Sequence, residues 1–388
     1  MVRLGVYTDY KYSLSGGRPH AERAFALFVA ALAERLDRVV VIGRLDPQGD
    51  ARYPLGDVEL VPLPHYPSLS NALPALRGML GSLRPFWRAL DELDCVWILG
   101  PHPLAFPFAL IARLRRRRVM LGVRQDLVPY MRSRHPGKRF RVALAQMMEA
   151  AFRLLARRWP TVVVGPALAE AYRGRAVLEV SVSLIEEDRI ASLSKATERD
   201  YSGELRALSV GRLENEKNPL ALADVLAEVR RLDDRWRLVV CGEGELREEL
   251  ERRLEELGLS DVAELRGYVP HDRGLADEYG SAHALLHVSW TEGLPQVLYE
   301  AFAAGLPVAA TDVGGIRDAA GDAALLAPPG DPKLMARNLD RIGRDEEKRR
   351  ALMQAGLEVA RTHTIESETS RVAEFVREET PRRLERKT

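Results

Sequence analysis

Cysteine is scarce in this sequence, and long apolar runs are missing. Only two cysteines occur among 388 residues, and Cys95 and Cys241 each lie in an apolar run typical of a strand. We expect two buried thiols in a reducing compartment, neither a disulfide nor a metal site. No uncharged apolar run reaches the length of a membrane span, and the first residues are typical of a strand rather than of a signal peptide. These absences favour a cytoplasmic globular protein.

Dinucleotide and metal motifs are missing as well. The sequence contains no G-x-G-x-x-G fingerprint and no Asp-x-Asp pair of the kind that bridges a metal ion to a diphosphate. Repeats and low-complexity tracts are also absent. What remains is a chain with 46% hydrophobic residues and a net charge of +1. Its length suits two or three domains with sizeable cores.

The most informative stretch runs from Thr291 to Val308. Its pattern predicts a loop, a helix that starts at Pro295, a tight turn at Gly305 and a buried strand. Glu292 lies in the loop and Glu300 lies in the helix. Because helical side chains lean toward the N-terminus, Glu300 should point back at the loop. Two carboxylates therefore converge on the mouth of one helix.

This pair of carboxylates needs a physical explanation, because a carboxylate is a poor neighbour for a phosphate. The free backbone N–H groups of the helix favour an anion, while Glu292 and Glu300 could accept hydrogen bonds from vicinal hydroxyls. Ribose and hexose rings present such hydroxyls, so the arrangement suits a sugar-bearing nucleotide. The alternative is that Glu292 is a solvated loop residue and Glu300 is ordinary helix surface.

A loop from Gly211 to Pro219 follows an apolar strand and precedes a helix, and it carries Arg212 and Lys217. Arg can hold a phosphate through two parallel hydrogen bonds and Lys acts as a point charge, so the two cations match a diphosphate. The alternative is that both are ion-paired to Glu214, Glu216 or another acid. Glu214 and Glu216 are expected to position Lys217.

A further loop with Gly242 and Gly244 also follows an apolar strand and allows close backbone approach. Together the three segments resemble the retaining GT-B glycosyltransferases of group 1, also called family four. Members carry a G-R-x4-K-N/G loop, a G-x-G loop, and an E-x7-E motif that opens E-G-x-P. The resemblance is strong over about residues 205–330 and looser elsewhere. The matching residues include Gly211, Arg212, Lys217, Asn218, Gly242, Gly244, Glu292, Gly293, Pro295, Glu300, Ala301, Gly305, Pro307 and Val308.

The resemblance implies roles for individual residues. Arg212 and Lys217 would hold the diphosphate of a donor, and Glu292 would bind hydroxyls of the transferred sugar. Glu300 would take the ribose diol, and Tyr268 would lie beside the base. The backbone N–H groups after Glu292 would flank the phosphate. The implied donor-binding residues are Gly16, Gly17, Gly242, Tyr268, Gly293, Leu294, Pro295, Gln296 and Glu300.

The resemblance also implies the α/β GT-B fold, in which two Rossmann-like doubly wound domains face a cleft. Residues 1–195 would form the acceptor-side domain, residues 196–365 the donor-side domain, and residues 366–388 a helix that crosses back to the first domain. In the N-terminal half, strands alternate with helical stretches, as in a parallel doubly wound sheet. Strands are predicted at Leu4–Thr8, Arg38–Ile42, Val58–Val61, Cys95–Leu99, Val119–Gly122 and Thr161–Val164.

The polar segment after the first strand ends at Gly16 and Gly17 and precedes a helix expected from about Ala21. In the family, a Gly-Gly loop at this place approaches the donor phosphate or the acceptor. The alternative is a flexible turn with no ligand.

One feature of the family is missing. Many relatives carry a histidine near the reacting sugar, after the strand that ends here at Val123, whereas this sequence has Arg124, Gln125 and Asp126. Gln125 could replace the histidine as a hydrogen-bond donor, and Asp126 could orient an acceptor hydroxyl or cap a helix. His102, after another strand, is a second candidate for the acceptor or sugar side, although a lone loop histidine is more often structural.

By resemblance, the reaction is transfer of a hexosyl group from a nucleoside-diphosphate sugar to a hydroxyl of a glycolipid, polysaccharide or small molecule, with retention. The departing diphosphate oxygen could itself accept the proton of the acceptor, which reduces the need for a protein base. No cofactor and no metal ion are expected. The alternatives are a non-catalytic nucleotide-sugar binder and a GT-B epimerase or phosphorylase. An epimerase or a phosphorylase accounts for the E-x7-E loop less well than a glycosyltransferase does.

Positive charge is concentrated between Arg113 and Arg158. This segment holds thirteen arginines and one lysine against Asp126 and Glu149 only, although the net charge of the chain is +1. Such a surface could dock on anionic lipid at the inner face of a membrane, or hold a phosphorylated acceptor. The alternative is a solvated arginine-rich face. No motif for nucleic-acid binding is present, so a nucleic-acid partner is not expected.

Overall fold

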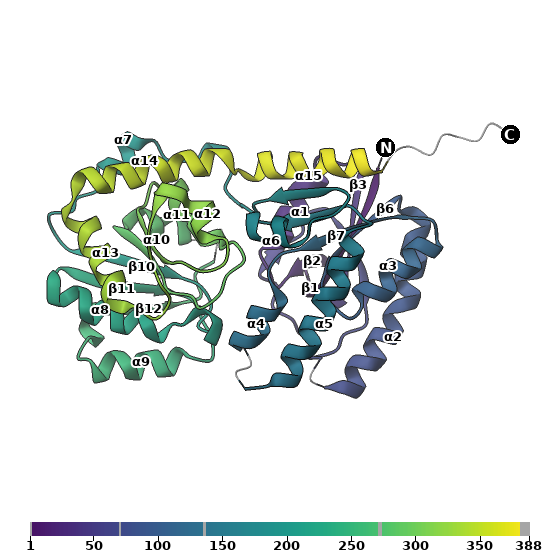
Figure 1. Cartoon of the computed structure of the whole chain (residues 1–388), viewed down its shortest axis with the longest axis horizontal. Coiled ribbons are helices and arrows are strands. Elements are labelled where there is room, and N and C mark those ends of the chain that lie inside the picture. Colours follow the sequence, from purple (N-terminus) through teal and green to yellow (C-terminus); the bar gives the residue numbers. More distant parts are fainter. Residues whose placement is uncertain (1, 70, 135–136, 271–273, 381–388) are drawn as a thin grey trace. The chain divides into compact units, whose positions relative to one another are not determined.

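The computed structural model describes residues 2–69, 71–134, 137–270 and 274–380 (Figure 1). The chain divides into two units. Unit 1 comprises residues 1–127 and 143–182 and the chain from Ile365 onward, and unit 2 comprises residues 128–142 and 183–364. Each unit contains one β-sheet covered by helices.

The sheet of unit 1 has a parallel core in the order β5-β3-β1-β6-β7-β8-β9. Its strands are rich in buried valine, isoleucine and leucine, as expected where both faces are covered. The predicted strands of this half are all present, and β2, β4 and β9 were not predicted. The strands are β1 (Arg3–Ser15), β2 (Arg18–Ala21), β3 (Arg38–Leu45), β4 (Tyr53–Pro54), β5 (Glu59–Leu63), β6 (Cys95–Gly100), β7 (Arg118–Val123), β8 (Thr161–Val164) and β9 (Val177–Val180).

The segment that contains Gly16 and Gly17 is the turn of a β-hairpin, not a loop that leads into a helix. Strand β1 continues to Ser15 and pairs antiparallel with β2. Gly16 and Gly17 have φ angles of 58° and 78°, which a two-residue hairpin turn requires at both positions. The following helix therefore starts at Phe25 rather than near Ala21.

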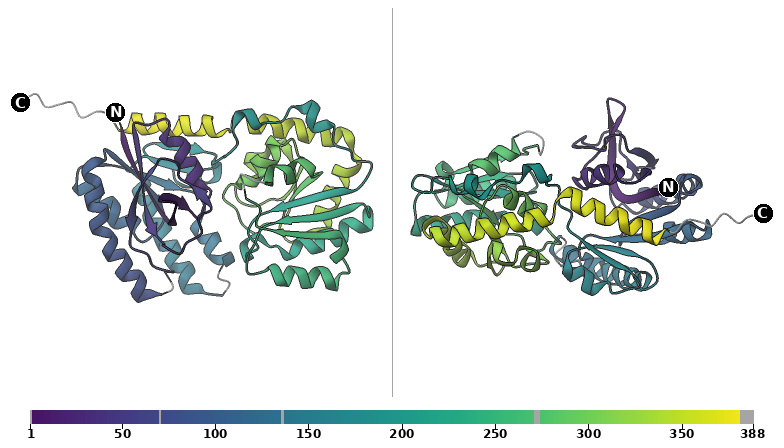
Figure 2. Two further views of the ribbon diagram at one scale, coloured as in Figure 1. Left: turned by 180° about the vertical axis from the view of Figure 1, so that it is seen from behind. Right: turned by 90° about the horizontal axis from the view of Figure 1, so that it is seen from above.

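Helices α2, α3 and α5 of unit 1 pack on one hydrophobic cluster with the sheet. Phe86 of α2 stacks on Phe108 of α3 with ring centroids 3.9 Å apart, and Phe106 of α3 meets Phe152 of α5 edge-on at 6.0 Å. Figure 2 shows α15 beside α1, with which it is in contact. The helices of unit 1 are α1 (Phe25–Ala33), α2 (Ala72–Ala89), α3 (Ala105–Leu114), α6 (Pro166–Ala171), α15 (Ile365–Glu379) and, from residue 143 onward, α5 (Arg139–Ala156). Helix α4 (Leu127–Arg134), apart from its first residue, and the start of α5 belong to unit 2.

Unit 2 contains a parallel six-stranded sheet in the order β12-β11-β10-β13-β14-β15. The strands are β10 (Leu205–Val210), β11 (Trp236–Cys241), β12 (Ala263–Gly267), β13 (Ala284–His287), β14 (Val308–Thr311) and β15 (Ala324–Ala327). The helices are α7 (Leu193–Thr197), α8 (Leu220–Leu232), α9 (Arg247–Glu256), α10 (Leu275–Ser281), α11 (Gln296–Ala303), α12 (Ile316–Ala320), α13 (Pro332–Arg344) and α14 (Glu346–Thr362). The predicted α/β class with two doubly wound, Rossmann-like sheets is therefore confirmed.

Two compositional expectations can be checked against the fold. Cys95 and Cys241 are both buried and free, as predicted, and they belong to different units. Within the described residues, no helix combines the length and the apolar character that a membrane span needs.

Candidate functional site

Three loops of unit 2 leave the carboxyl ends of the neighbouring strands β11, β10 and β13. This edge of an open parallel sheet is where α/β proteins bind their ligands. The loops comprise residues 242–246, 211–219 and 288–295, and they hold the predicted donor-binding motifs. The fold therefore places the three motifs of the sequence at one edge of one sheet.

Packing between two of these loops requires glycine at positions 242 and 244. The N–H of Gly211 donates to the carbonyl of Cys241 at 3.0 Å. A Cβ atom on Gly242 would lie 1.7 Å from the carbonyl oxygen of Gly211, and one on Gly244 would lie 2.3 Å from that of Leu213. The close backbone approach expected here is made between loops of the protein itself, and contact of Gly242 with a ligand stays a prediction.

Arg212 is held by two acids of its own loop. It forms an ion pair with Glu214, and its Nη2 donates to Oε1 of Glu216 at 3.0 Å. Burial and the neighbouring Glu214 carboxylate raise the pKa of Glu216, and Arg212 acts against that increase. The acidic pair thus holds Arg212 rather than positioning Lys217, because the short 3₁₀ turn Asn215–Lys217 directs Lys217 toward another loop.

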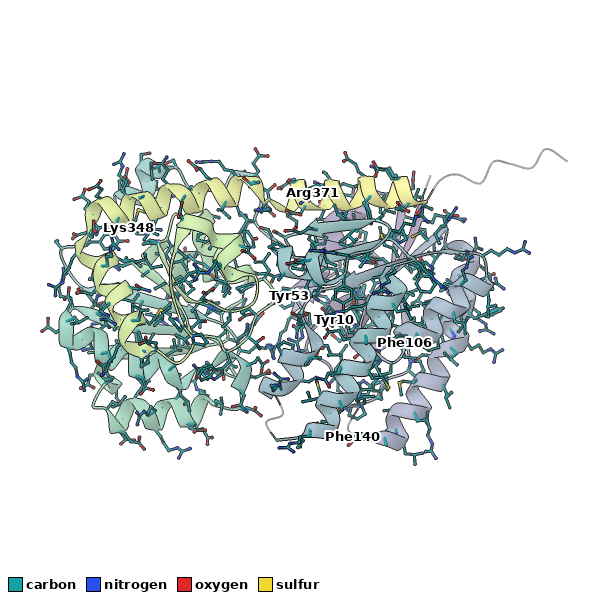
Figure 3. All side chains as sticks on the ribbon, viewed as in Figure 1. Tyr10, Tyr53, Phe106, Phe140, Lys348 and Arg371 are labelled. Atoms are coloured by element: carbon teal, nitrogen blue, oxygen red, sulfur yellow. The ribbon has the colours of Figure 1, made fainter. Side chains whose placement is uncertain are left out.

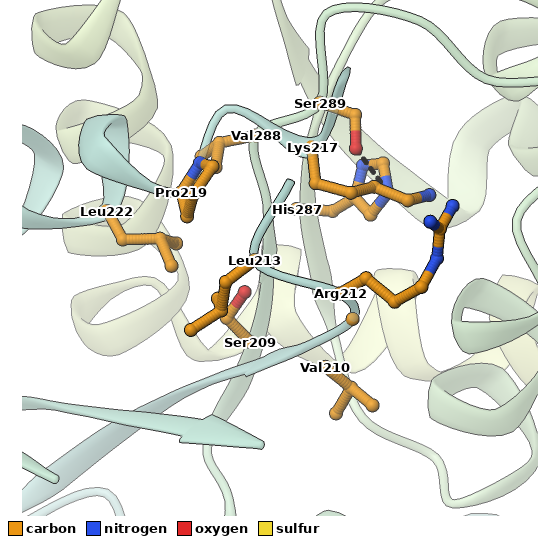
Figure 4. Close-up of a pocket in the computed structure, with 11 residues that line it drawn as sticks. Ser209, Val210, Arg212, Leu213, Lys217, Pro219, Leu222, His287, Val288 and Ser289 are labelled. Carbon is orange, nitrogen blue, oxygen red and sulfur yellow. Dashed lines mark hydrogen bonds between the residues drawn. The ribbon is translucent and has the colours of Figure 1, made fainter. Parts of the chain in front are cut away.

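Arg212 and Lys217 line one pocket together with His287 and Ser289. Figure 4 shows the two cationic side chains ending beside each other, with the histidine and the serine next to Lys217. The pocket floor is formed by apolar side chains at the start of α8, including Leu222. The predicted pairing of two cations at one place is therefore present.

Glu292 receives three hydrogen-bond donors on a single oxygen. Its Oε1 pairs with the Lys217 ammonium, accepts the Ser289 hydroxyl at 2.7 Å and lies 3.0 Å from Nε2 of His287. The side chain is 9% exposed, and no partner of Oε2 is found among the described residues. Burial works against ionisation of Glu292, but the charge of Lys217 and the bond from His287 hold its pKa well below the usual range. Glu292 is thus an ionised carboxylate with one oxygen left for a ligand.

The backbone around Glu292 is fixed by the turn after β14. Gly314 has a φ angle of 57°, and a Cβ atom there would lie 2.0 Å from the carbonyl oxygen of Glu292. The N–H of Gly315 donates to the carbonyl of Gly293 at 3.1 Å, and the Thr311 hydroxyl donates to that of Ser289 at 2.8 Å. The segment Thr311–Gly315 therefore supports the loop that carries Glu292.

Helix α11 begins one residue later than expected, because Pro295 is its N-cap, with extended backbone. Leu294 and Gln296 flank that position, at the helix mouth. Glu300 lies one turn into the helix, and its Oε2 accepts the Tyr279 hydroxyl at 2.6 Å. Tyr268 follows the edge strand β12 and is 39% exposed. The roles of these residues toward a donor stay predictions.

The candidates Gly16, Gly17 and His102 lie in unit 1. The glycines form the exposed hairpin tip, whereas His102 is buried between Tyr7 and Asp9. The Tyr7 hydroxyl lies 3.0 Å from Nδ1 of His102, and Oδ2 of Asp9 lies 3.2 Å from Nε2. Burial opposes ionisation of Asp9, but His102 holds its pKa below the usual value. The contact of His102 with a sugar or an acceptor stays a prediction.

Arg124, Gln125 and Asp126 directly follow strand β7 of unit 1. The Arg124 guanidinium lies over the Phe25 ring at 4.5 Å, and burial lowers its pKa to about 10. Gln125 is exposed. Asp126 is 3.9 Å from Arg153, and burial raises the pKa of Asp126. Their contact with a sugar or an acceptor stays a prediction.

Sequence reasoning missed His287, Ser289 and the structural role of Asn218. His287 ends strand β13, which is only four residues long and was not predicted. A histidine directly after Ala-Leu-Leu and five residues before Glu292 is the signal that could have indicated it. Asn218 adopts a left-handed backbone with φ of 52°, and its amide donates to the carbonyl of Val288 at 3.2 Å. This bond joins the loop of Lys217 to the loop of Glu292.

Comparison with curated proteins finds relatives that are glycosyltransferases. The 2-deoxystreptamine glucosyltransferase of Streptomyces kanamyceticus is 28% identical over 323 residues, which cover 74% of this chain and 81% of that protein. The D-inositol 3-phosphate glycosyltransferase of Frankia alni is 36% identical over 164 residues, 39% of this chain and 40% of that protein. The chain therefore spans most of the first relative and less than half of the second.

Solved structures share the fold across the chain at low identity. Sucrose-phosphate synthase from Thermosynechococcus elongatus gives a TM-score of 0.77 at 18% identity and covers 97% of this chain and 99% of its own. Anabaena HepE in complex with UDP-glucose gives 0.71 at 17% identity, with 96% and 99% covered. These likenesses show the GT-B fold.

The family comparison assigns the segment that carries the site. Residues 193–359 match the model of the family described as glycosyl transferases group 1. This range contains Arg212, Lys217, His287, Glu292 and Glu300. The resemblance to the group 1 glycosyltransferases inferred from the motifs is therefore confirmed over residues 193–359.

Proposed function

We propose that unit 2 binds a nucleoside-diphosphate sugar and that the protein transfers its hexosyl group to an acceptor hydroxyl, with retention of anomeric configuration. The observation that carries this proposal is the state of Glu292. Its Oε1 is shared by Lys217, His287 and Ser289, while Oε2 has no partner among the described residues. A largely buried, ionised carboxylate with one available oxygen suits the hydroxyls of a sugar ring.

The two cations beside Glu292 supply the charge that a diphosphate needs. Glu214 and Glu216 leave the Arg212 guanidinium oriented before any ligand arrives, so little reorganisation is required when negative charge develops on the leaving group. Lys217 contributes a second positive charge at the same pocket. In this mechanism the bond between the anomeric carbon and the diphosphate oxygen breaks as the acceptor oxygen forms the new glycosidic bond. The leaving diphosphate oxygen accepts the proton of the acceptor hydroxyl.

Further residues complete the proposed donor site. Glu300, fixed by the Tyr279 hydroxyl, accepts hydrogen bonds from the ribose diol, and the N–H groups at the mouth of α11 lie beside a phosphate. Donor binding is proposed to be independent of a metal ion, because Arg212 and Lys217 take the neutralising role. On the acceptor or sugar side we retain Gln125 as the proposed hydrogen-bond donor in place of the family histidine.

The experiment is a thermal-shift screen of UDP-, GDP- and ADP-sugars, followed by assay of nucleoside diphosphate release. A UDP-sugar is the first choice, since the structurally similar HepE was solved with UDP-glucose. A bound donor raises the apparent melting temperature by mass action, and slow hydrolysis indicates chemistry. Binding without release would favour a non-catalytic nucleotide-sugar binder, and isomerisation of the sugar would favour an epimerase. Retention is read from the anomeric configuration of the product by NMR.

A further inference from the structure

Exposed hydrophobic side chains gather on three neighbouring helices. Among the described residues, ten of the fifteen exposed large hydrophobic side chains belong to α2, α3 and α5. They are Leu73, Leu76, Leu80 and Trp87 on α2, Leu110 and Leu114 on α3, and Phe140, Leu144, Met147 and Leu154 on α5. We call the nine residues of this set that belong to unit 1, all except Phe140, together with the exposed arginines of the same helices in unit 1, the α2–α3–α5 face. A few scattered exposed hydrophobics are normal, but such a gathering marks an interaction surface.

The exposed hydrophobic residues form regular stripes along their helices and are not core residues that lack packing partners. Positions 73, 76, 80 and 87 of α2 follow the helical repeat on the outer side, while Ala75, Gly78, Ser82 and Phe86 are buried on the inner side. The inner side is already filled, because Phe86 stacks on Phe108. Figure 3 shows Phe106 on α3, whose ring also lies on the inner side, edge-on to Phe152 of α5.

The charge on these helices has one sign. Within unit 1, α2, α3 and α5 contain five arginines and one acid, Glu149, although the chain as a whole carries only +1. Glu149 is buried against Arg153. The exposed arginines at 77, 84, 88 and 113 have no ion-pair or hydrogen-bond partner among the described residues. Unneutralised arginine therefore alternates with leucine and tryptophan along the face.

The arginine run after α3 contributes less than its sequence suggested. Arg115 forms an ion pair with Asp91 and lies over the Trp87 ring at 4.7 Å, and Arg117 donates to the carbonyl of Asp91 at 3.2 Å. These two cations are bound within unit 1. Leu110 of α3 and the four exposed residues of α2 lie outside the region Arg113–Arg158, in which the sequence placed a membrane-facing surface, whereas Leu114 and the exposed residues of α5 lie inside it.

We propose that the α2–α3–α5 face docks on the surface of an anionic lipid bilayer. Leucine and methionine side chains enter the boundary between headgroups and acyl chains, while the arginines stay at the level of the lipid phosphates. Trp87 suits the membrane interface, because its indole ring is apolar while its N–H group can remain hydrated. A second copy of the chain is a poor occupant, because it would bring the same uncompensated arginines against this face.

The test is co-sedimentation of the full chain with vesicles of phosphatidylcholine alone and with vesicles that also contain phosphatidylglycerol. Wild-type protein should bind the anionic vesicles, and binding should weaken as salt rises from about 0.1 M to about 0.5 M. The variant R77E/R84E/R88E should bind at least about tenfold more weakly. The matched control R252E/R337E/R350E reverses three exposed arginines on helices of unit 2 and should retain most of the binding despite the equal change in net charge.

A second variant tests the apolar part independently of charge. L73S/L76S/L80S should lower binding to anionic vesicles several-fold, whereas L232S, which changes an exposed leucine of α8, should not. Circular dichroism of each variant checks that it folds. Equal binding of wild type and both face variants overturns the proposal, and so does concentration-dependent dimerisation of the wild type that both face variants abolish. Vesicle binding needs no nucleotide sugar, so this proposal and the proposed transferase activity can fail separately.

Discussion

The ammonium group of Lys217 lies on Oε1 of Glu292, although the two residues are 75 positions apart in the chain. Lys217 comes from the loop after β10 and Glu292 from the loop after β13. The ion pair therefore connects the cationic loop and the acidic loop that the family motifs describe separately. In the absence of a donor, Lys217 balances the charge of a buried carboxylate, so the site is assembled before it is filled.

The strength of this pair can be measured by a double-mutant cycle. We expect Lys217→Met and Glu292→Gln each to lower the free energy of unfolding, since each leaves the other group in a poorly solvated place. The coupling energy of the two changes should be about 1–3 kcal/mol. Urea denaturation of the wild type, both single variants and the double variant gives this value. Additive effects within about 0.5 kcal/mol would contradict a direct interaction.

Stability should depend on pH through Glu292. Its pKa in the folded protein lies below the usual value, which is about 4.3 in an unfolded chain. Ionised Glu292 therefore stabilises the fold above about pH 4.3, and this contribution is lost as the pH falls toward the folded-state pKa. The observable is the difference in the free energy of unfolding between wild type and Glu292→Gln, measured at a series of pH values. That difference should shrink on acidification below about pH 4.3, and a constant difference would refute the role of Glu292.

Adding one carbon at Gly242 should disturb the Arg212 loop. The new Cβ atom would lie 1.7 Å from the carbonyl oxygen of Gly211, so the backbone has to move. We expect Gly242→Ala to destabilise the protein by at least about 2 kcal/mol and to weaken donor binding in a thermal-shift assay. Gly203→Ala is the matched control, because a Cβ atom there meets no other atom within 4 Å. Similar stability of the two variants would show that the loops adapt freely.

Transfer activity should survive removal of divalent metal ions. Arg212 and Lys217 line one pocket, and two cations placed in this way can neutralise a diphosphate without a metal ion. The measurement is release of nucleoside diphosphate from the donor before and after EDTA treatment, with Arg212→Ala as the variant that should lose at least about a hundredfold in kcat/KM. Loss of activity in EDTA that magnesium or manganese restores would refute metal independence.

Much of the candidate site could be predicted because its parts are local. The loop, helix and strand from Thr291 to Val308 are specified by glycine, proline and apolar spacing within a few residues, and the structure contains them with the helix start shifted to Gln296. His287 was missed because its strand β13 was not predicted. The hairpin at Gly16–Gly17 was missed because its antiparallel pairing departs from the parallel rhythm around it.

The sequence by itself determined most of the strands and helices, which loops carry cations and which carry acids, and which family these motifs resemble. Only the tertiary structure decided which cation meets which acid. Arg212 forms ion pairs with Glu214 and Glu216 of its own loop. Lys217 forms an ion pair with Glu292, because strand order brings the loops after β10 and β13 to one edge of the sheet. The same holds for the α2–α3–α5 face. The spacing of exposed hydrophobic residues is a property of the sequence of each helix. The packing of Phe86, Phe106, Phe108 and Phe152 places the three helices on one core.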